Sequence, residues 1–307
     1  MSLYTDANSI IEKSIEDVLP DEACKKALQE IDLGQRVHII AIGKAAWQMA
    51  HAAAISLGDQ LIDGIVITKY HHSQGPIPKL EIYEAAHPTP DDKGIKATGR
   101  AIKLAEGLDE DDCLLFLVSG GGSSLFEDPM ISLSDLQDIN NQLLGCGASI
   151  TEINTVRKHL SHVKGGRFAK IAQPARVYSI ILNDIIGDYP SMIASGPTYP
   201  DTSTSAQALA ILDKYSYRLK TTPSRPSKLK PLMILNVRIQ SSVVAFLVFV
   251  NLLQNIVKSW ATSLLFSRIA LFARQKKQVA SLALLQRLML TLLKISALSQ
   301  EERLSYT

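Results

Sequence analysis

Cysteine is scarce in this chain of 307 residues, and its three cysteines lie far apart. Cys24, Cys113 and Cys146 form no Cys-x-x-Cys pair. This spacing favours neither a zinc site nor a disulfide framework, and it predicts a reducing compartment, the cytoplasm. The first 21 residues carry acids and no long apolar run, so we expect no signal peptide. The apolar fraction of 46% and the charged fraction of 20% are typical of a globular protein with ample core.

Glycine, aspartate, histidine and cysteine are all absent from residue 222 onward. All 17 glycines lie at or before Gly196, and the last aspartate is Asp213. Residues 222–307 contain 12 Lys and Arg but only two Asp and Glu. Residues 1–221 contain 20 Lys and Arg and 28 Asp and Glu. An α/β domain needs Gly and Asp in its turns. We therefore predict an α/β domain over residues 1–217 and an atypical tail, rich in Leu, Ser, Lys and Arg, over residues 218–307. Our hypothesis for this tail is translation in a shifted reading frame.

Two other interpretations of the tail stay open. Residues 239–257 carry no charge over 19 residues, which is close to the roughly 20 needed to span a bilayer. Six Gln, Ser and Asn side chains lower the hydrophobicity of this stretch, so a membrane anchor is not our first expectation. A basic extension that binds nucleic acid is the other interpretation, but the basic residues are spread along the tail and form no patch. We therefore expect neither a membrane nor a nucleic acid as partner.

Short apolar runs alternate with amphipathic stretches before the tail begins. Strands are predicted at residues 37–42, 62–68, 80–85, 113–118 and 177–182. Helices are predicted at residues 9–26 with a break near Pro20, from residue 46 to 54, at 91–107, after Ser132 up to 144, and at 156–172. Alternating strands and helices imply right-handed crossovers. We therefore predict an α/β fold with a mostly parallel, doubly wound, Rossmann-like sheet and helices on both faces.

An abrupt change in composition follows the predicted strand 113–118. Its apolar residues give way to Ser119, Gly120, Gly121, Gly122, Ser123 and Ser124. Glycines allow positive φ and a close approach of an anion to the backbone, and the serines add donors. Ligands of open α/β sheets bind where loops leave the carboxyl ends of the strands. The segment therefore predicts a cradle for phosphate or carboxylate, with a tight turn that binds nothing as the alternative. It matches neither the P-loop nor the Gly-x-Gly-x-x-Gly pattern.

Three further groups of polar residues occur at or near the ends of predicted elements. Lys44 lies at a predicted helix N-terminus. The positive end of the helix dipole and the ammonium of Lys44 would both attract an anion there. Arg157 and Lys164 are seven residues apart, so that one helical face could carry both. Asp184 and Asp188 directly follow the strand at 177–182 and suit Mg²⁺. Taken singly, each group is equally typical of a solvated surface, a turn or a helix cap.

Taken in order along the chain, these residues resemble the glycerate kinase family of the MOFRL type, the glycerate 2-kinases. The resemblance spans residues 5–217. It rests on residues 43–46, 84–91, 116–124, 152–161 and 164–167, on Asp184, on residues 187–188 and on residues 193–198. The chain departs from the family pattern at Ser124, where the family has Ala. It also departs at residues 183–189, where Asn-Asp-Ile-Ile-Gly-Asp-Tyr replaces Ser-Asp-Val-Pro-Gly-Asp-Asp.

The resemblance implies ATP-dependent phosphorylation of D-glycerate to 2-phosphoglycerate with Mg²⁺. It implies catalytic roles for Lys44, Asp184 and Asp188, the two aspartates being the candidate Mg²⁺ ligands. It implies substrate or phosphate binding by Ser119, Gly120, Gly121, Gly122, Ser123, Ser124, Asn154, Arg157, Lys158 and Lys164. The family also predicts a second, C-terminal α/β domain, which residues 218–307 do not resemble. A hydroxypyruvate reductase and an inactive fragment that still binds nucleotide or substrate remain the alternatives, and the sequence predicts no oligomeric state.

Overall fold

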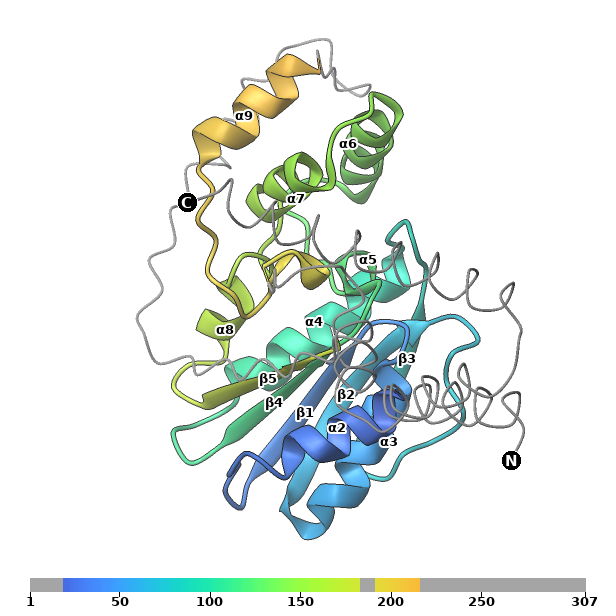
Figure 1. The fold of residues 1–307 in the computed structure, drawn as a ribbon, viewed down its shortest axis with the longest axis vertical. Helices are drawn as coiled ribbons and strands as arrows, with labels where there is room; N and C mark the ends of the chain where they lie inside the picture. The colour runs from blue at the N-terminus through green and yellow to red at the C-terminus, as the bar shows by residue number, and fades with distance from the viewer. Residues whose placement is uncertain (1–18, 183–190, 216–307) are drawn as a thin grey trace, which may run out of the picture. The chain divides into compact units, whose positions relative to one another are not determined.

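The computed structural model describes residues 19–182 and 191–215, and the structural statements below concern these residues (Figure 1). Five parallel strands form one sheet in the order β3-β2-β1-β4-β5. The strands are β1 (Val37–Ile42), β2 (Leu61–Lys69), β3 (Leu80–Ala85), β4 (Cys113–Val118) and β5 (Arg176–Ile181). Each overlaps a strand predicted from the sequence to within a residue at either end. The predicted parallel α/β fold is confirmed.

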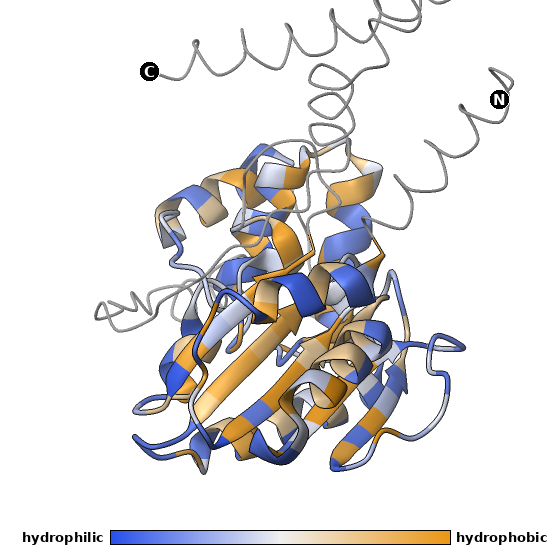
Figure 2. Cartoon of the chain, turned by 60° about the horizontal axis from the view of Figure 1, so that its bottom comes forward, coloured by the Kyte–Doolittle hydropathy of each residue, from blue (hydrophilic) through white to orange (hydrophobic). Residues whose placement is uncertain are grey.

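The two central strands explain why their sequences are apolar without interruption. Every residue of β1 and of β4 is buried, because β1 pairs with β2 on one side and with β4 on the other, while helices cover both faces of the sheet. A strand buried on both faces has no polar positions to alternate with the apolar ones. Figure 2 shows the ribbon in the middle of the sheet as predominantly hydrophobic.

Helices pack on both faces of the sheet and enclose a separate core on each. One core contains α2 (Pro20–Leu28) and α3 (Ala46–Leu57), and the other contains α4 (Asp92–Glu106) and α8 (Arg167–Ile171). Alanines form much of the buried side of α3 and of α4. Small side chains let a helix approach the sheet closely, so apolar area is buried over most of the length of each helix.

A third core lies among three helices toward the end of the sheet where the short α5 (Gly122–Leu125) lies (Figure 1). These helices are α6 (Leu133–Gly145), α7 (Ile150–His159) and α9 (Ser205–Lys214), and their apolar sides form one cluster. Capping boxes at Ser149 and Thr204 begin α7 and α9, and they satisfy backbone N–H groups that a helix leaves free. The 3₁₀ turns η1 (Gly58–Gln60) and η2 (Ile193–Ser195) complete the described elements.

The predicted break near Pro20 falls where α2 begins, since Pro20 is the first residue of α2; proline fits the first turn of a helix, where its missing N–H has no partner to lose. The helix predicted before Pro20 lies outside the described residues. The helix predicted at 156–172 is two helices, since α7 ends at His159 and α8 begins at Arg167. Gly165 and Gly166 between them have φ of 60° and 79°, a conformation that no α-helix continues. Arg157 and Lys164 therefore do not share a helical face.

Candidate anion site at the carboxyl edge of the sheet

The loops that follow β1 and β4 are joined by hydrogen bonds where the two strands end. The backbone N–H of Lys44 donates to the carbonyl oxygen of Gly120 at 2.9 Å, and the N–H of Ser119 donates to Ile42 at 2.9 Å. The Ser119 hydroxyl accepts from the N–H of Ala45 at 3.0 Å and donates to the Ile42 carbonyl at 3.1 Å. These bonds place Lys44 beside the glycine-rich loop, as the sequence predicts. They also give the Ser119 hydroxyl, which is buried, a role in joining the loops.

Gly43 and Gly121 are the two glycines that this junction requires. Gly43 has φ of 111°, and a Cβ placed there would lie 2.3 Å from Oγ of Ser119. Gly121 has φ of 88°, and a Cβ placed there would lie 2.9 Å from the ring of His87 and 3.3 Å from Cε of Lys44. Only glycine adopts these backbone angles without strain and leaves the space open. The N–H groups of Gly122 and Ser124 donate back to carbonyls of the same loop.

Lys44 has a fixed backbone and an exposed side chain. Its carbonyl oxygen accepts from Nδ1 of His72 at 3.0 Å, and the hydroxyl of Thr68 donates to the Gly43 carbonyl at 3.0 Å. The flexible ammonium thus starts from a backbone position held by two neighbouring loops and by strand β2. A lysine ammonium is a compact point charge on a flexible stem, so Lys44 could contact an anion bound at the glycine-rich loop.

The sequence prediction did not include His87 among the site residues. It follows β3 and is half-buried, with its ring against Gly121. Burial lowers the pKa of His87, and the positive charges of Lys44, Lys69 and His72 lower it further. The imidazole is therefore neutral at neutral pH. The signal that could have found it is its position at the carboxyl end of a predicted strand, within the motif at residues 84–91.

Polar side chains also lie around Ser123, near the end of the glycine-rich loop. The hydroxyl of Ser195 donates to Oδ1 of Asn154 at 3.1 Å and lies 3.2 Å from the hydroxyl of Ser123. Ala194 and Ser195 have φ of 52° and 60°, which costs a non-glycine residue free energy and recurs at functional sites. The structure thus brings Asn154 and Ser123 together, and it adds Ser195, which the sequence prediction had not named as a site residue.

Lys164 lies beneath the loop, with no exposed surface. Its ammonium donates to the carbonyl oxygens of Ser123 at 2.8 Å and Phe126 at 2.9 Å, and lies 3.3 Å from a carboxylate oxygen of Glu127. Burial lowers the pKa of Lys164, and the charge of Glu127 opposes that shift. Three partners within the protein occupy the three donors of the ammonium. The structure therefore connects Lys164 to the anion loop through the backbone of the loop.

Arg157 and Lys158, both on α7, have partners on neighbouring segments. Nε of Arg157 donates to Oδ1 of Asn140 at 2.7 Å, and burial lowers the pKa of Arg157. Nζ of Lys158 lies 3.4 Å from Oδ1 of Asp201. These bonds link α7 to α6 and to the segment before α9.

The predicted Mg²⁺ ligands Asp184 and Asp188 lie outside the described residues. Among residues 19–182 and 191–215, no three or more His, Cys, Asp or Glu side chains form a group that could hold a metal ion. The stretch 239–257 also lies outside the described residues, and none of the helices in the described part has the length and hydropathy to cross a membrane.

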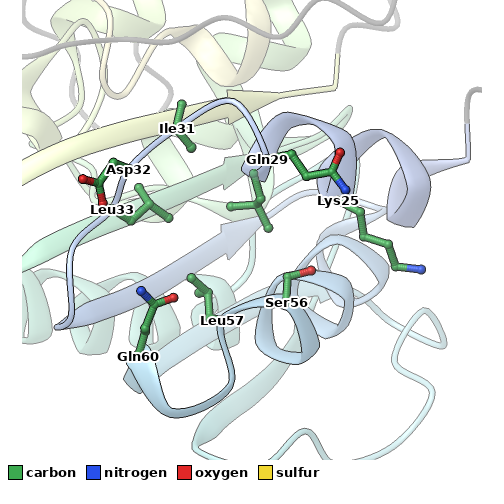
Figure 3. A pocket seen from close by; sticks show the side chains of 9 residues that line it. Lys25, Gln29, Ile31, Asp32, Leu33, Ser56, Leu57 and Gln60 are labelled. Carbon is green, nitrogen blue, oxygen red and sulfur yellow. The ribbon is translucent and has the colours of Figure 1, made fainter.

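A cavity of about 420 Å³ opens elsewhere, between α2 and α3 (Figure 3). Its lining residues come from the end of α2, the connection to β1, and the segment that ends α3 and leads to β2: Lys25, Leu28, Gln29, Ile31, Asp32, Leu33, Ser56, Leu57 and Gln60. These segments lead into the amino ends of β1 and β2, at the edge opposite the glycine-rich loop. The cavity is therefore separate from the predicted site.

A parallel five-stranded sheet with helices on both faces defines the class of doubly wound α/β domains, and the glycine-rich loop and Lys44 lie at its carboxyl edge. Residues 6–229 match a family model described as a domain of unknown function, DUF4147. The chain belongs to this family.

Curated relatives and solved structures agree with the resemblance to glycerate kinases. The D-glycerate 2-kinase of Thermotoga maritima is 52% identical over 226 residues, which cover 73% of this chain and 54% of that protein. A putative hydroxypyruvate reductase of Agrobacterium vitis is 42% identical over 68% of this chain and 48% of its own length. The crystal structure of the Thermotoga maritima glycerate kinase has a TM-score of 0.76 and 47% identity, covering 83% of this chain and 61% of that one. The chain thus spans about half the length of the curated relatives it matches.

Proposed function

We propose that the protein is a glycerate 2-kinase, which transfers the γ-phosphoryl group of ATP to the 2-hydroxyl of D-glycerate. The observation that carries this proposal is the bond between the Lys44 N–H and the Gly120 carbonyl, which fixes the backbone of a lysine beside a glycine-rich loop. Support also comes from similarity to proteins named D-glycerate 2-kinase and glycerate 2-kinase. ATP and D-glycerate are the proposed small-molecule partners, and the cytoplasm is the proposed location.

The proposed reaction breaks the bond between the γ-phosphorus of ATP and the bridging oxygen, and ADP leaves. A bond forms between that phosphorus and the 2-hydroxyl oxygen of D-glycerate, whose proton is released. Phosphoryl transfer asks the protein mainly to position the reactants and to neutralise charge. Lys44 would neutralise charge on the transferring group or the substrate carboxylate. The loop Ser119–Ser124 would hold phosphate oxygens, with Asn154 and Ser195 fixing its Ser123 side.

The remaining predicted residues have supporting roles in this proposal. Arg157, Lys158 and Lys164 would add positive potential around the site from their positions inside the protein. Asp184 and Asp188 would hold Mg²⁺, which would neutralise phosphate charge when bound. One of these two carboxylates is also the proposed acceptor of the hydroxyl proton.

An assay of product identity tests this function. The purified full chain is incubated with ATP, Mg²⁺ and D-glycerate, and the products are analysed by ³¹P NMR. We expect ADP and 2-phosphoglycerate in equal amounts. A parallel sample with hydroxypyruvate and NADH or NADPH tests the alternative suggested by the relatives named putative hydroxypyruvate reductase.

Two results would contradict the proposal. Oxidation of the nicotinamide without phosphoglycerate formation would make the protein a reductase. Binding of ATP or D-glycerate in calorimetry, without turnover of either, would make it a ligand-binding fragment.

A further inference from the structure

Positive charge gathers around the Gly121 side of the loop from four neighbouring strands. Lys44 follows β1, Lys69 ends β2, and His72 lies between β2 and β3. His87 follows β3, and Gly121 follows β4. Because the strands are parallel and adjacent, their carboxyl ends deliver these residues to one edge of the sheet.

Gly121 lets two of these groups pack closely against the loop backbone. Its missing Cβ would lie 2.9 Å from Cδ2 and 3.0 Å from Nε2 of His87, and 3.3 Å from Cε of Lys44. The imidazole and the lysine side chain therefore approach the same point of the loop backbone. The missing side chain at Gly121 allows this approach, and it sets the two groups side by side where one small ligand would contact both.

The charges at this point suit an anion. Partial burial holds the pKa of His87 below its usual value, and the neighbouring positive charges of Lys44, Lys69 and His72 lower it further. An anion bound between His87 and Lys44 would reverse that effect, because an opposite charge within about 4–6 Å favours the protonated imidazole.

We propose that His87 is an anion-binding residue of this site, whose imidazole donates an N–H to an oxyanion that Lys44 also contacts. The oxyanion is a phosphoryl group or a carboxylate, the two anions that the proposed kinase reaction would supply, so the identity of the ligand rests on the proposed function. A neutral imidazole donates one N–H to the oxyanion. When the pH lies below the pKa that His87 has in the complex, the imidazole is protonated and also attracts the oxyanion by its positive charge.

NMR titration of the seven histidines in the full chain tests the proposal without any turnover. The His87 signal is assigned by its loss in His87→Gln, and its pKa is measured with inorganic phosphate, with ATP, with D-glycerate and with no ligand. We expect at least one ligand to raise the pKa of His87 by about one pH unit, as one added charge at this distance does. A response to phosphate and ATP identifies a phosphoryl subsite, and a response to D-glycerate alone identifies a carboxylate subsite.

Binding measurements on variants supply the second readout. His87→Leu should weaken binding of the responding ligand at least about tenfold, as the loss of a charge-assisted hydrogen bond does. His87→Gln should bind like the wild type at high pH but take up no proton on binding. His51→Gln is the matched control, because His51 is exposed on α3 and stacks on Trp47. This variant should change neither the affinity for the ligand nor the proton uptake on binding.

The outcomes separate this proposal from the proposed function. If no ligand moves the pKa of His87, or if His87→Leu binds every ligand like the wild type, the subsite proposal is wrong even where the kinase is active. If phosphate or ATP raises the pKa while no phosphoglycerate forms, the subsite stands and the kinase assignment fails.

Discussion

Lys164 and Glu127 form a buried ion pair beneath the glycine-rich loop, with 3.3 Å between Nζ and the nearer carboxylate oxygen. The lysine has no exposed surface, and the Glu127 side chain is 3% exposed. The same ammonium donates to the carbonyls of Ser123, within α5, and of Phe126, directly after it, so one buried charge holds α5 at two points. The other carboxylate oxygen of Glu127 has no hydrogen-bond partner among the described residues. Removing the lysine would therefore leave a buried charge without compensation.

Lys164→Met should destabilise the protein by about 3–5 kcal/mol, the usual effect of breaking a buried ion pair. Urea unfolding followed by circular dichroism measures the difference. Lys170→Met is the matched control, because Lys170 is exposed on α8, and it should change the free energy of unfolding by less than about 0.5 kcal/mol. Equal stability of the two variants would show that the Lys164–Glu127 pair does not hold the loop.

Gly43→Ala should destabilise the protein and disrupt the loop junction. A Cβ at Gly43 would lie 2.3 Å from the Ser119 hydroxyl and 2.4 Å from the Ser119 carbonyl oxygen, and its φ of 111° adds a backbone penalty of about 1–3 kcal/mol. We expect a lower Tm together with weaker ATP binding in calorimetry.

Gly99→Ala is the control for the glycine prediction. Gly99 lies within α4, and a Cβ there would meet no atom within 4 Å. Alanine in a helix interior is more favourable than glycine by about 0.5–1 kcal/mol, so this variant should raise Tm and leave ATP binding unchanged. A Gly43→Ala variant as stable as the wild type would refute the tight junction between the loops after β1 and β4.

His159 should make the protein sensitive to mild acid. Burial lowers its pKa below the usual 6.5, against the opposing charge of Asp201, whose carboxylate lies 3.6 Å away. The charges of Arg167 and Lys158 lower it further. Between the folded pKa and about 6.5 the unfolded chain binds more protons than the folded chain, so stability falls as pH falls through that range and is fully present above it.

Unfolding free energies measured from about pH 5 to 7.5 test the role of His159. His159→Gln should flatten the pH dependence, since glutamine does not titrate and can replace the bond to the Ser203 hydroxyl. His51→Gln, which alters an exposed histidine, should keep the slope of the wild type. An unchanged slope in His159→Gln would mean that other groups cause the acid sensitivity.

The sheet could be predicted because its strands carry a strong local signal. β1 and β4 are uninterrupted apolar runs that break sharply into turns, and strands buried on both faces require that pattern. The break within 156–172 was missed although the pair Gly165 and Gly166 is a breaker signal in the sequence. In the structure their positive φ accompanies contacts with the end of η2, where their N–H groups donate to the carbonyls of Ser195 and Gly196.

The closeness of Lys44 to the glycine-rich loop follows from the sequence for the same kind of reason. Lys44 and the glycine-rich loop end adjacent strands, so the topology alone brings them together. The environment of Lys164 could not be read from the sequence, because its partners Ser123 and Glu127 lie about 40 residues earlier. A lysine is rarely buried, and only the three-dimensional packing shows that this one is.

The steady-state kinetics of Lys44→Met test the central claim most directly, that Lys44 and the glycine-rich loop form a phosphoryl-transfer site. The purified full chain and the variant are assayed with ATP and D-glycerate under the same conditions. Because the Lys44 side chain is exposed, the variant should unfold at the wild-type Tm. We predict that its kcat/KM falls by about 10²–10³, the usual effect of removing one group that stabilises charge in the transition state. A folded variant with wild-type kcat/KM would contradict the account.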